Sequence, residues 1–168
     1  MSRHACFVVL ALLLVSGCAR EAPKAPLTHT FESPMAAAQA VLDGFAREDL
    51  SALQTLALTE QEFREHVWPE LPVSRPERNM PFEYVWGQTA QRSDHSLRQT
   101  YARYRGEPFT LVGVEFEGET TDYPTFSVSR RTVLVVTNAE GAEERLRLFG
   151  SLLRQGDRYK VYSYVVSD

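Results

Sequence analysis

The sequence predicts an α+β domain in which helices precede an antiparallel sheet. Between residues 33 and 105, apolar residues recur at spacings of three and four, which places them on single helical faces. From residue 110 onwards the spacing changes to two, and turn signals separate the segments. Three to four helices followed by hairpin-connected strands are typical of helices packed on one face of a sheet.

Capping signals predict where the first three helices begin. Each signal stands directly before an apolar run: Ser33-Pro34, Asp49 and Thr59-x-x-Glu62. A longer stripe predicts a fourth helix over residues 82–105, which Gly87 could interrupt. Gly106, followed shortly by a proline, would end that helix.

Four strands are expected in the second half of the chain. Their alternating apolar residues predict strands over residues 112–116, 126–136, from the turn at 138–141 to Leu152, and 159–166. Gly150 falls in the middle of the third strand. A glycine there marks a bend or a close approach of another backbone.

This order of elements resembles the nuclear transport factor 2-like fold, with a cystatin-like arrangement as the neighbouring alternative. The resemblance covers residues 33–168 and depends on a long helix placed directly before a curved meander. It implies a cone-shaped domain, a sheet that wraps the helices, and in many members a pocket. The enzymes among these relatives place Asp, His or Tyr inside the cone as a general acid or base.

The start of the chain predicts export and a lipid anchor. Arg3 precedes an apolar run that is too short to span a bilayer, which requires about 20 residues. Val15-Ser16-Gly17-Cys18 then resembles the lipobox of bacterial lipoproteins. The resemblance implies cleavage before Cys18 and acylation of Cys18, so that no transmembrane helix is needed.

The predicted organisation is therefore a signal peptide over residues 1–17, a lipidated Cys18 with a flexible tether over 18–32, and one domain over 33–168. Ala19 and Arg20 lack the aspartate that resembles an inner-membrane retention signal. The expected location is the bacterial cell envelope, at the outer membrane facing the periplasm.

Composition excludes several functions. The net charge of −4 and the absence of a basic block argue against nucleic acid as a partner. Of the two cysteines, Cys6 lies in the signal peptide, so the mature chain can form no internal disulfide and perform no thiol catalysis. No motif predicts a cofactor or a metal site.

Arg130 is the sharpest candidate for a ligand-binding residue in the predicted sheet. It falls in step with Phe126, Val128 and Leu134, so an unbroken strand would point its guanidinium into the cone. The favoured alternative is a β-bulge at Arg130-Arg131 that turns both arginines to solvent and brings Val133 and Val135 inward.

Two pairs of polar residues are further candidates for a functional site. Glu62 and His66 have the i, i+4 spacing of metal ligands, but their charged neighbours favour a solvated helix face. Glu115 and Glu117 share a strand face that the pattern assigns to solvent. No catalytic residue is predicted.

The segment VWPELPVSRPERNMPFEYVW, residues 67–86, admits two interpretations. As a recognition lid, it would offer Arg75 and Arg78 to an acidic or glycan partner, with Trp68 and Trp86 as aromatic anchors. As a structural clamp, which we favour, it would bury the tryptophans and leave the arginines outside.

The expected function is that of a membrane-anchored periplasmic binding module without catalytic activity. Its partners beyond the lipid bilayer would be an envelope protein, a glycan or a small ligand, and the sheet edges make a homodimer plausible. The alternative is an isomerase or dehydratase that uses a pocket inside the cone.

Overall fold

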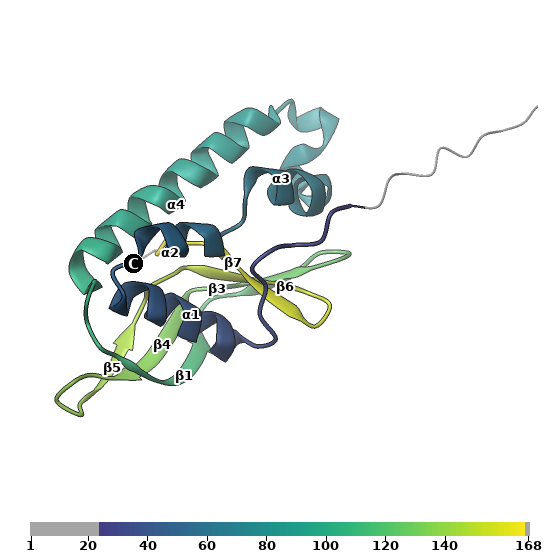
Figure 1. The fold of residues 1–168 in the computed structure, drawn as a ribbon. Helices are drawn as coiled ribbons and strands as arrows, with labels where there is room; N and C mark the ends of the chain where they lie inside the picture. The colour runs from purple at the N-terminus through teal and green to yellow at the C-terminus, as the bar shows by residue number, and fades with distance from the viewer. Residues whose placement is uncertain (1–23, 167–168) are drawn as a thin grey trace, which may run out of the picture.

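The protein has an α+β fold, with helices in the first half of the chain and strands in the second (Figure 1). The computed structural model describes residues 24–166. The helices are α1 (Pro34–Ala46), α2 (Leu50–Leu56), α3 (Glu60–Glu62) and α4 (Phe82–Tyr104). A π-helical turn, η1 (Phe63–Val67), continues α3, and the 3-10 turns η2 (Trp68–Glu70), η3 (Pro72–Ser74) and η4 (Pro76–Arg78) lead to α4.

All three predicted helix starts are confirmed. The side chains of Ser33 and Asp49 accept hydrogen bonds from Ala36 N and Ala52 N, respectively. Thr59 and Glu62 form the reciprocal bonds of a capping box. The fourth helix is also confirmed; it runs through Gly87 without a break.

The strands form two antiparallel sheets, so the prediction of one four-stranded sheet is wrong. The strands are β1 (Thr110–Phe116), β2 (Thr120–Asp122), β3 (Ser127–Arg130), β4 (Thr132–Thr137), β5 (Glu143–Leu146), β6 (Ser151–Gln155) and β7 (Arg158–Ser163). One sheet has the order β1-β4-β5 and the other β2-β3-β6-β7. Two predicted long strands each contribute to both sheets, because each is broken in the middle.

The breaks have identifiable causes. Between β3 and β4 the backbone of Arg131 takes a left-handed conformation with φ 55°. Between β5 and β6, Gly150 allows the backbone of Val165 to pass so close that a Cβ atom on Gly150 would lie 1.7 Å from the Val165 carbonyl oxygen. The expectation of a close backbone approach at Gly150 is confirmed.

The apolar core consists of two clusters on opposite faces of β6. In the first, Leu152 packs with residues of α1 such as Val41 and Phe45. In the second, Leu153 packs with Phe63 of η1 and with residues of β3. Adjacent residues of one strand thus face different helices, which is the alternation that a doubly covered strand requires.

Residues 25–31 belong to the domain, which corrects the predicted flexible tether over 18–32. Phe31 exchanges two backbone hydrogen bonds of 2.8 Å with Tyr159, beside the free side of β7. Leu27 packs on the second core cluster. No periodic pattern marks this segment in the sequence, because its contacts are made largely by backbone atoms. The predicted signal peptide and Cys18 lie outside the described residues.

Candidate functional site

A cavity of about 220 Å³ lies between α4, the end of α2 and β7. Trp86, Ala90 and Leu97 form its α4 side, while Leu58 and Tyr162 lie across from them. The α4 residues have helical spacings of four and seven, which bring them to one face of the helix. The lining is mainly apolar, and the cavity opens to solvent.

Tyr162 contributes to the wall of this cavity, and its hydroxyl has no partner among the described residues. Within residues 24–166 it makes no hydrogen bond, whereas neighbouring Tyr164 donates to Leu53 O at 2.6 Å. Burial raises the pKa of Tyr162 to about 12; the nearby Tyr123 also raises it and Arg130 lowers it. Tyr162 is therefore a neutral hydrogen-bonding group at physiological pH.

Asp94 lies at the rim of the cavity. Its carboxylate accepts a hydrogen bond of 2.7 Å from Arg98 Nε and one of 2.9 Å from Gln54 Nε2, which links α2 to α4. The hydrogen bond from Arg98 is the main cause of a lowered pKa for Asp94. Asp94 is therefore ionised at neutral pH, and each of its two carboxylate oxygens already accepts one hydrogen bond.

The residues of the proline-rich segment do not come together in one lid. Trp86 contributes to the cavity wall, while Trp68 packs edge-on against Phe82 with ring centroids 5.5 Å apart. Both tryptophans are half-buried, and Arg75 and Arg78 are exposed in the turns between them. This placement agrees with the clamp interpretation.

The position of Arg130 agrees in part with each of its two predicted positions, inside the cone or in solvent. It follows the alternation of β3 on the side of Val128, is half-buried and donates a hydrogen bond to Thr121 Oγ1. The chain then breaks at Arg131, whose side chain is exposed. The prediction that the break turns both arginines fully to solvent is wrong for Arg130. Val133 and Val135 are buried, and so are the residues that alternate with them.

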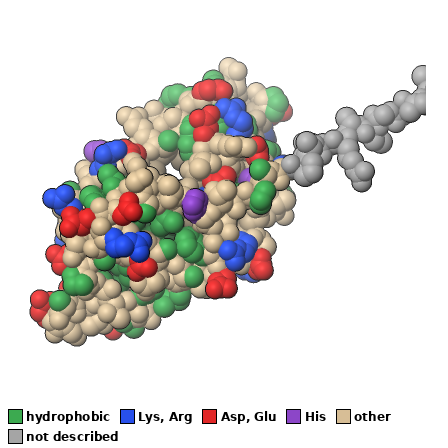
Figure 2. Space-filling model, viewed as in Figure 1, with side chains coloured by type: hydrophobic (Ala, Val, Ile, Leu, Met, Phe, Trp, Pro, Cys, Tyr) green, Lys and Arg blue, Asp and Glu red, His purple; other side chains and the backbone are tan. Residues whose placement is uncertain are grey.

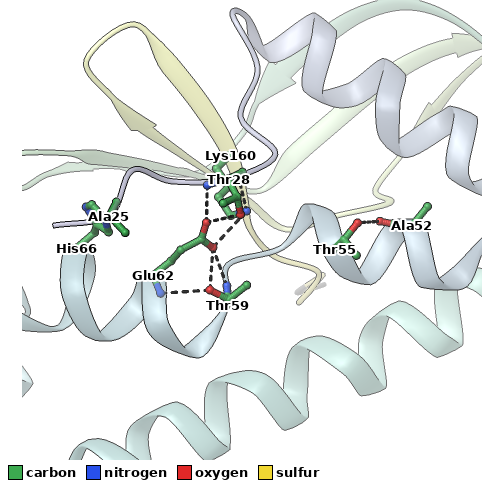
Figure 3. Close-up of polar contacts among 8 residues, drawn as sticks. All are labelled: Ala25, Thr28, Ala52, Thr55, Thr59, Glu62, His66 and Lys160. Atoms are coloured by element: carbon green, nitrogen blue, oxygen red, sulfur yellow. Dashed lines mark hydrogen bonds and ion pairs between the residues drawn. The ribbon is translucent and has the colours of Figure 1, made fainter.

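The structure contains a buried ion pair that was not predicted from the sequence. Glu62 and Lys160 are 6% and 0% exposed, and Lys160 Nζ lies 3.3 Å from Glu62 Oε2. Figure 3 shows the Glu62 carboxylate between Thr59 and Thr28 as well. The backbone carbonyl of Thr28 in turn accepts a hydrogen bond of 2.8 Å from Lys160.

The environment of this pair favours a charged Glu62. Burial acts to raise the pKa of Glu62, but the backbone N–H groups of Thr59 and Thr28 and the charge of Lys160 together lower it. Burial also lowers the pKa of Lys160, and the attraction of Glu62 offsets only part of that shift. The pair attaches the N-terminal segment to the last strand.

The solvated helix face predicted for Glu62 and His66 is wrong, because His66 is only 7% exposed. Its Nε2 lies 2.7 Å from Ala25 O and so carries the proton, and its Nδ1 faces Gln155 Nε2 at 3.4 Å. Glu62 and His66 thus have separate partners and do not act as one ligand pair. Glu115 and Glu117 are exposed, as predicted, and pair with Arg145 at 2.7 and 3.1 Å.

Comparison of the chain with protein-family models, with curated proteins and with solved structures gave no match. Within residues 24–166, no helix is both long and apolar enough to cross a membrane.

Proposed function

We propose that the protein is a lipid-anchored envelope protein whose domain binds a small, mainly apolar molecule without transforming it. The cavity between α4 and β7 carries this proposal, because its wall is mainly apolar and aromatic and includes Tyr162, whose hydroxyl makes no hydrogen bond within residues 24–166. Sites of this kind combine apolar walls with a few polar groups that orient the ligand. Pockets for drug-sized ligands measure roughly 300–1,000 Å³, so a cavity of about 220 Å³ suits a smaller ligand of one or two rings.

We further propose a nuclear transport factor 2-like arrangement for the domain. A long helix, α4, directly precedes the strands, and the breaks at Arg131 and Gly150 divide those strands between two sheets. The cavity lies between that helix and the sheet. A cystatin-like arrangement is the neighbouring alternative.

The groups in the cavity favour binding over proton transfer. An efficient general acid or base has a pKa near the working pH. The pKa of Tyr162 is raised to about 12, and that of Asp94 is lowered from an already acidic value. Each group would therefore transfer protons poorly at neutral pH.

The surface is consistent with this proposal. On the face shown in Figure 2, acidic and basic side chains are interspersed with apolar ones. Such a mixture lacks the extended basic area that nucleic-acid binding requires.

Binding of 2-naphthol to the full-length protein tests the cavity. Titration followed by tryptophan fluorescence is expected to show saturable quenching, because Trp86 lines the cavity. Ala90→Phe, which fills the cavity, should weaken binding at least tenfold. Ala102→Phe, at an exposed position of the same helix, is the matched control and should leave binding unchanged. Equal affinity in both variants would refute binding in this cavity.

Intact mass of the membrane-extracted protein tests the anchor. Cleavage before Cys18 with lipidation predicts the mass of residues 18–168 plus a diacylglyceryl group on the thiol, with or without a third acyl chain on the new amino group. Cys18→Ser should abolish this increment and release the protein from membranes. A wild-type chain without acyl mass would refute the anchor.

The isomerase or dehydratase alternative is favoured by one observation: Tyr162, whose hydroxyl makes no hydrogen bond within residues 24–166, lines the cavity. It predicts that the protein catalyses exchange of the α-hydrogens of cyclohexanone in D₂O, measurable by NMR. Tyr162→Phe should remove that activity, whereas a binding protein gives no exchange above the buffer rate.

A further inference from the structure

The N-terminal segment joins the domain at one end of the molecule. Among the described residues, Ala25 is the first that forms a hydrogen bond, which its carbonyl oxygen accepts from His66 of η1. Figure 1 shows that the chain reaches the domain at the end formed by α3, η1 and the turns that follow, with the β2–β3 and β6–β7 hairpins beside them. The β4–β5 turn lies at the opposite end.

The docked segment leaves only a short connection to Cys18. Ala25 lies seven positions after Cys18 along the chain, and an extended chain of seven such steps spans at most about 25 Å. A domain of this size has a diameter of roughly 40 Å. If Cys18 is in the bilayer, as the proposed function requires, the far end cannot face the membrane while Ala25 stays within reach.

The maximum length of the connection between Cys18 and the domain depends on where the domain begins. A tether that extended to residue 32, as the sequence suggested, could span up to about 50 Å and would permit any orientation. Docking of residues 25–31 through Thr28 and Phe31 removes about half of that length. The contacts of this segment therefore restrict which surface meets the lipid.

The surface at the anchored end has suitable chemistry. Met80 and Tyr84 are among the exposed large apolar or aromatic residues, with exposures of 38% and 59%. Arg75 and Arg78 are exposed nearby and form no ion pair with any residue between 24 and 166. Tyrosine is enriched at the level of lipid headgroups, and arginine can place its apolar stem in the interface while its charge meets phosphate.

We propose that the turns η2–η4 and the start of α4 form a membrane-contacting surface, with Met80 and Tyr84 at the headgroup level. Pro72, Pro76 and Pro81 fix the backbone of this surface, so little conformational entropy is lost on contact. The proposal rests on acylation of Cys18. It assigns a role to the exposed side of the proline-rich segment, whose other side forms the core clamp.

Fluorescence quenching by brominated lipid in the acylated, full-length protein tests this proposal. Met80→Cys and, as control, Ala139→Cys in the β4–β5 turn are labelled with NBD-maleimide and placed in vesicles of phosphatidylethanolamine and phosphatidylglycerol. Acylated Cys18 is a thioether and does not react. Quenching is expected to be at least threefold stronger at position 80 than at position 139.

The outcomes separate the two proposals. Equal quenching at both positions in a protein with confirmed acyl mass would overturn the membrane-contacting surface and leave the anchor intact. A protein without acyl mass would overturn both. The Tyr84→Trp variant gives a second test that needs no label. The fluorescence emission of the new tryptophan should shift to shorter wavelength when the acylated protein is bound to vesicles. An unchanged emission spectrum would contradict the proposal.

Discussion

The carboxylate of Glu62 contacts three parts of the chain that are distant in sequence. It accepts hydrogen bonds from Thr28 and Thr59 and pairs with Lys160. Removal of one member of a buried ion pair leaves the other charge without compensation, which costs about 3–5 kcal/mol. The pair therefore contributes chiefly by making alternative arrangements of these segments unfavourable.

Glu62→Gln is expected to lower the free energy of unfolding by about 3 kcal/mol, because Lys160 would remain buried without an anion. Urea denaturation at pH 7 measures this change. Glu60→Gln, in the same helix, removes only an exposed pair with Arg64 and should cost less than about 0.5 kcal/mol. Similar losses in the two variants would contradict the assigned role of the buried pair.

Stability should fall on the acid side in a way that depends on Glu62. The pKa of Glu62 in the folded protein is below the ordinary value of 4.5, so its contribution is present above that value and is lost as the pH falls through the folded-state pKa. Urea midpoints measured from pH 7 to pH 3 should decline more steeply for the wild type than for Glu62→Gln. Parallel curves would show that other carboxylates determine the acid limit.

At the level of elements, Gly150 controls the junction between the two sheets. Gly150→Ala should destabilise the protein by about 3 kcal/mol or more, because the new Cβ would overlap the backbone of Val165. Thermal denaturation measures the effect. Gly87→Ala is the matched control: nothing lies within 4 Å of its added Cβ, and the change should stabilise α4 by about 0.5–1 kcal/mol. A mild effect at Gly150 would mean that the C-terminal backbone moves freely there.

The helices could be predicted from the sequence because their signals are local. The N-caps at Ser33, Asp49 and Thr59 act over three residues, and the structure confirms each of them. An irregularity at Arg130-Arg131 was predicted as a β-bulge, but its effect on the sheet was not, since alternation continues through it and a left-handed arginine has no distinctive signal. The breaks at Arg131 and Gly150 together divide the one predicted sheet into two.

The candidate site was predictable only in part. Trp86 was identified as a binding residue, but Tyr162 was not, because membership of a cavity depends on how α4 lies across β7. Lys160 shares a strand face with Tyr162 and Tyr164. A charged residue among aromatic neighbours was therefore the one sequence signal that pointed to a buried lysine. Its partner Glu62 lies 98 positions earlier, and no local pattern connects the two.

At the scale of the whole molecule, the domain should need its N-terminal segment. Deletion of residues 1–31 removes the contacts of Thr28 and Phe31 and exposes buried partners, so it should cost at least about 2 kcal/mol relative to deletion of residues 1–24. Urea denaturation of the two soluble proteins measures the difference. Equal stability would show that residues 25–31 contribute little to the fold.

The contact between Thr28 and Lys160 joins residues 132 positions apart, so almost the entire chain must be synthesised before it can form. Native pairings at such separations slow folding, because a long loop must close before they stabilise anything. Until β7 is present, the N-terminal segment lacks its partner strand. The same contact that holds this segment in the folded domain therefore makes the final assembly step dependent on β7.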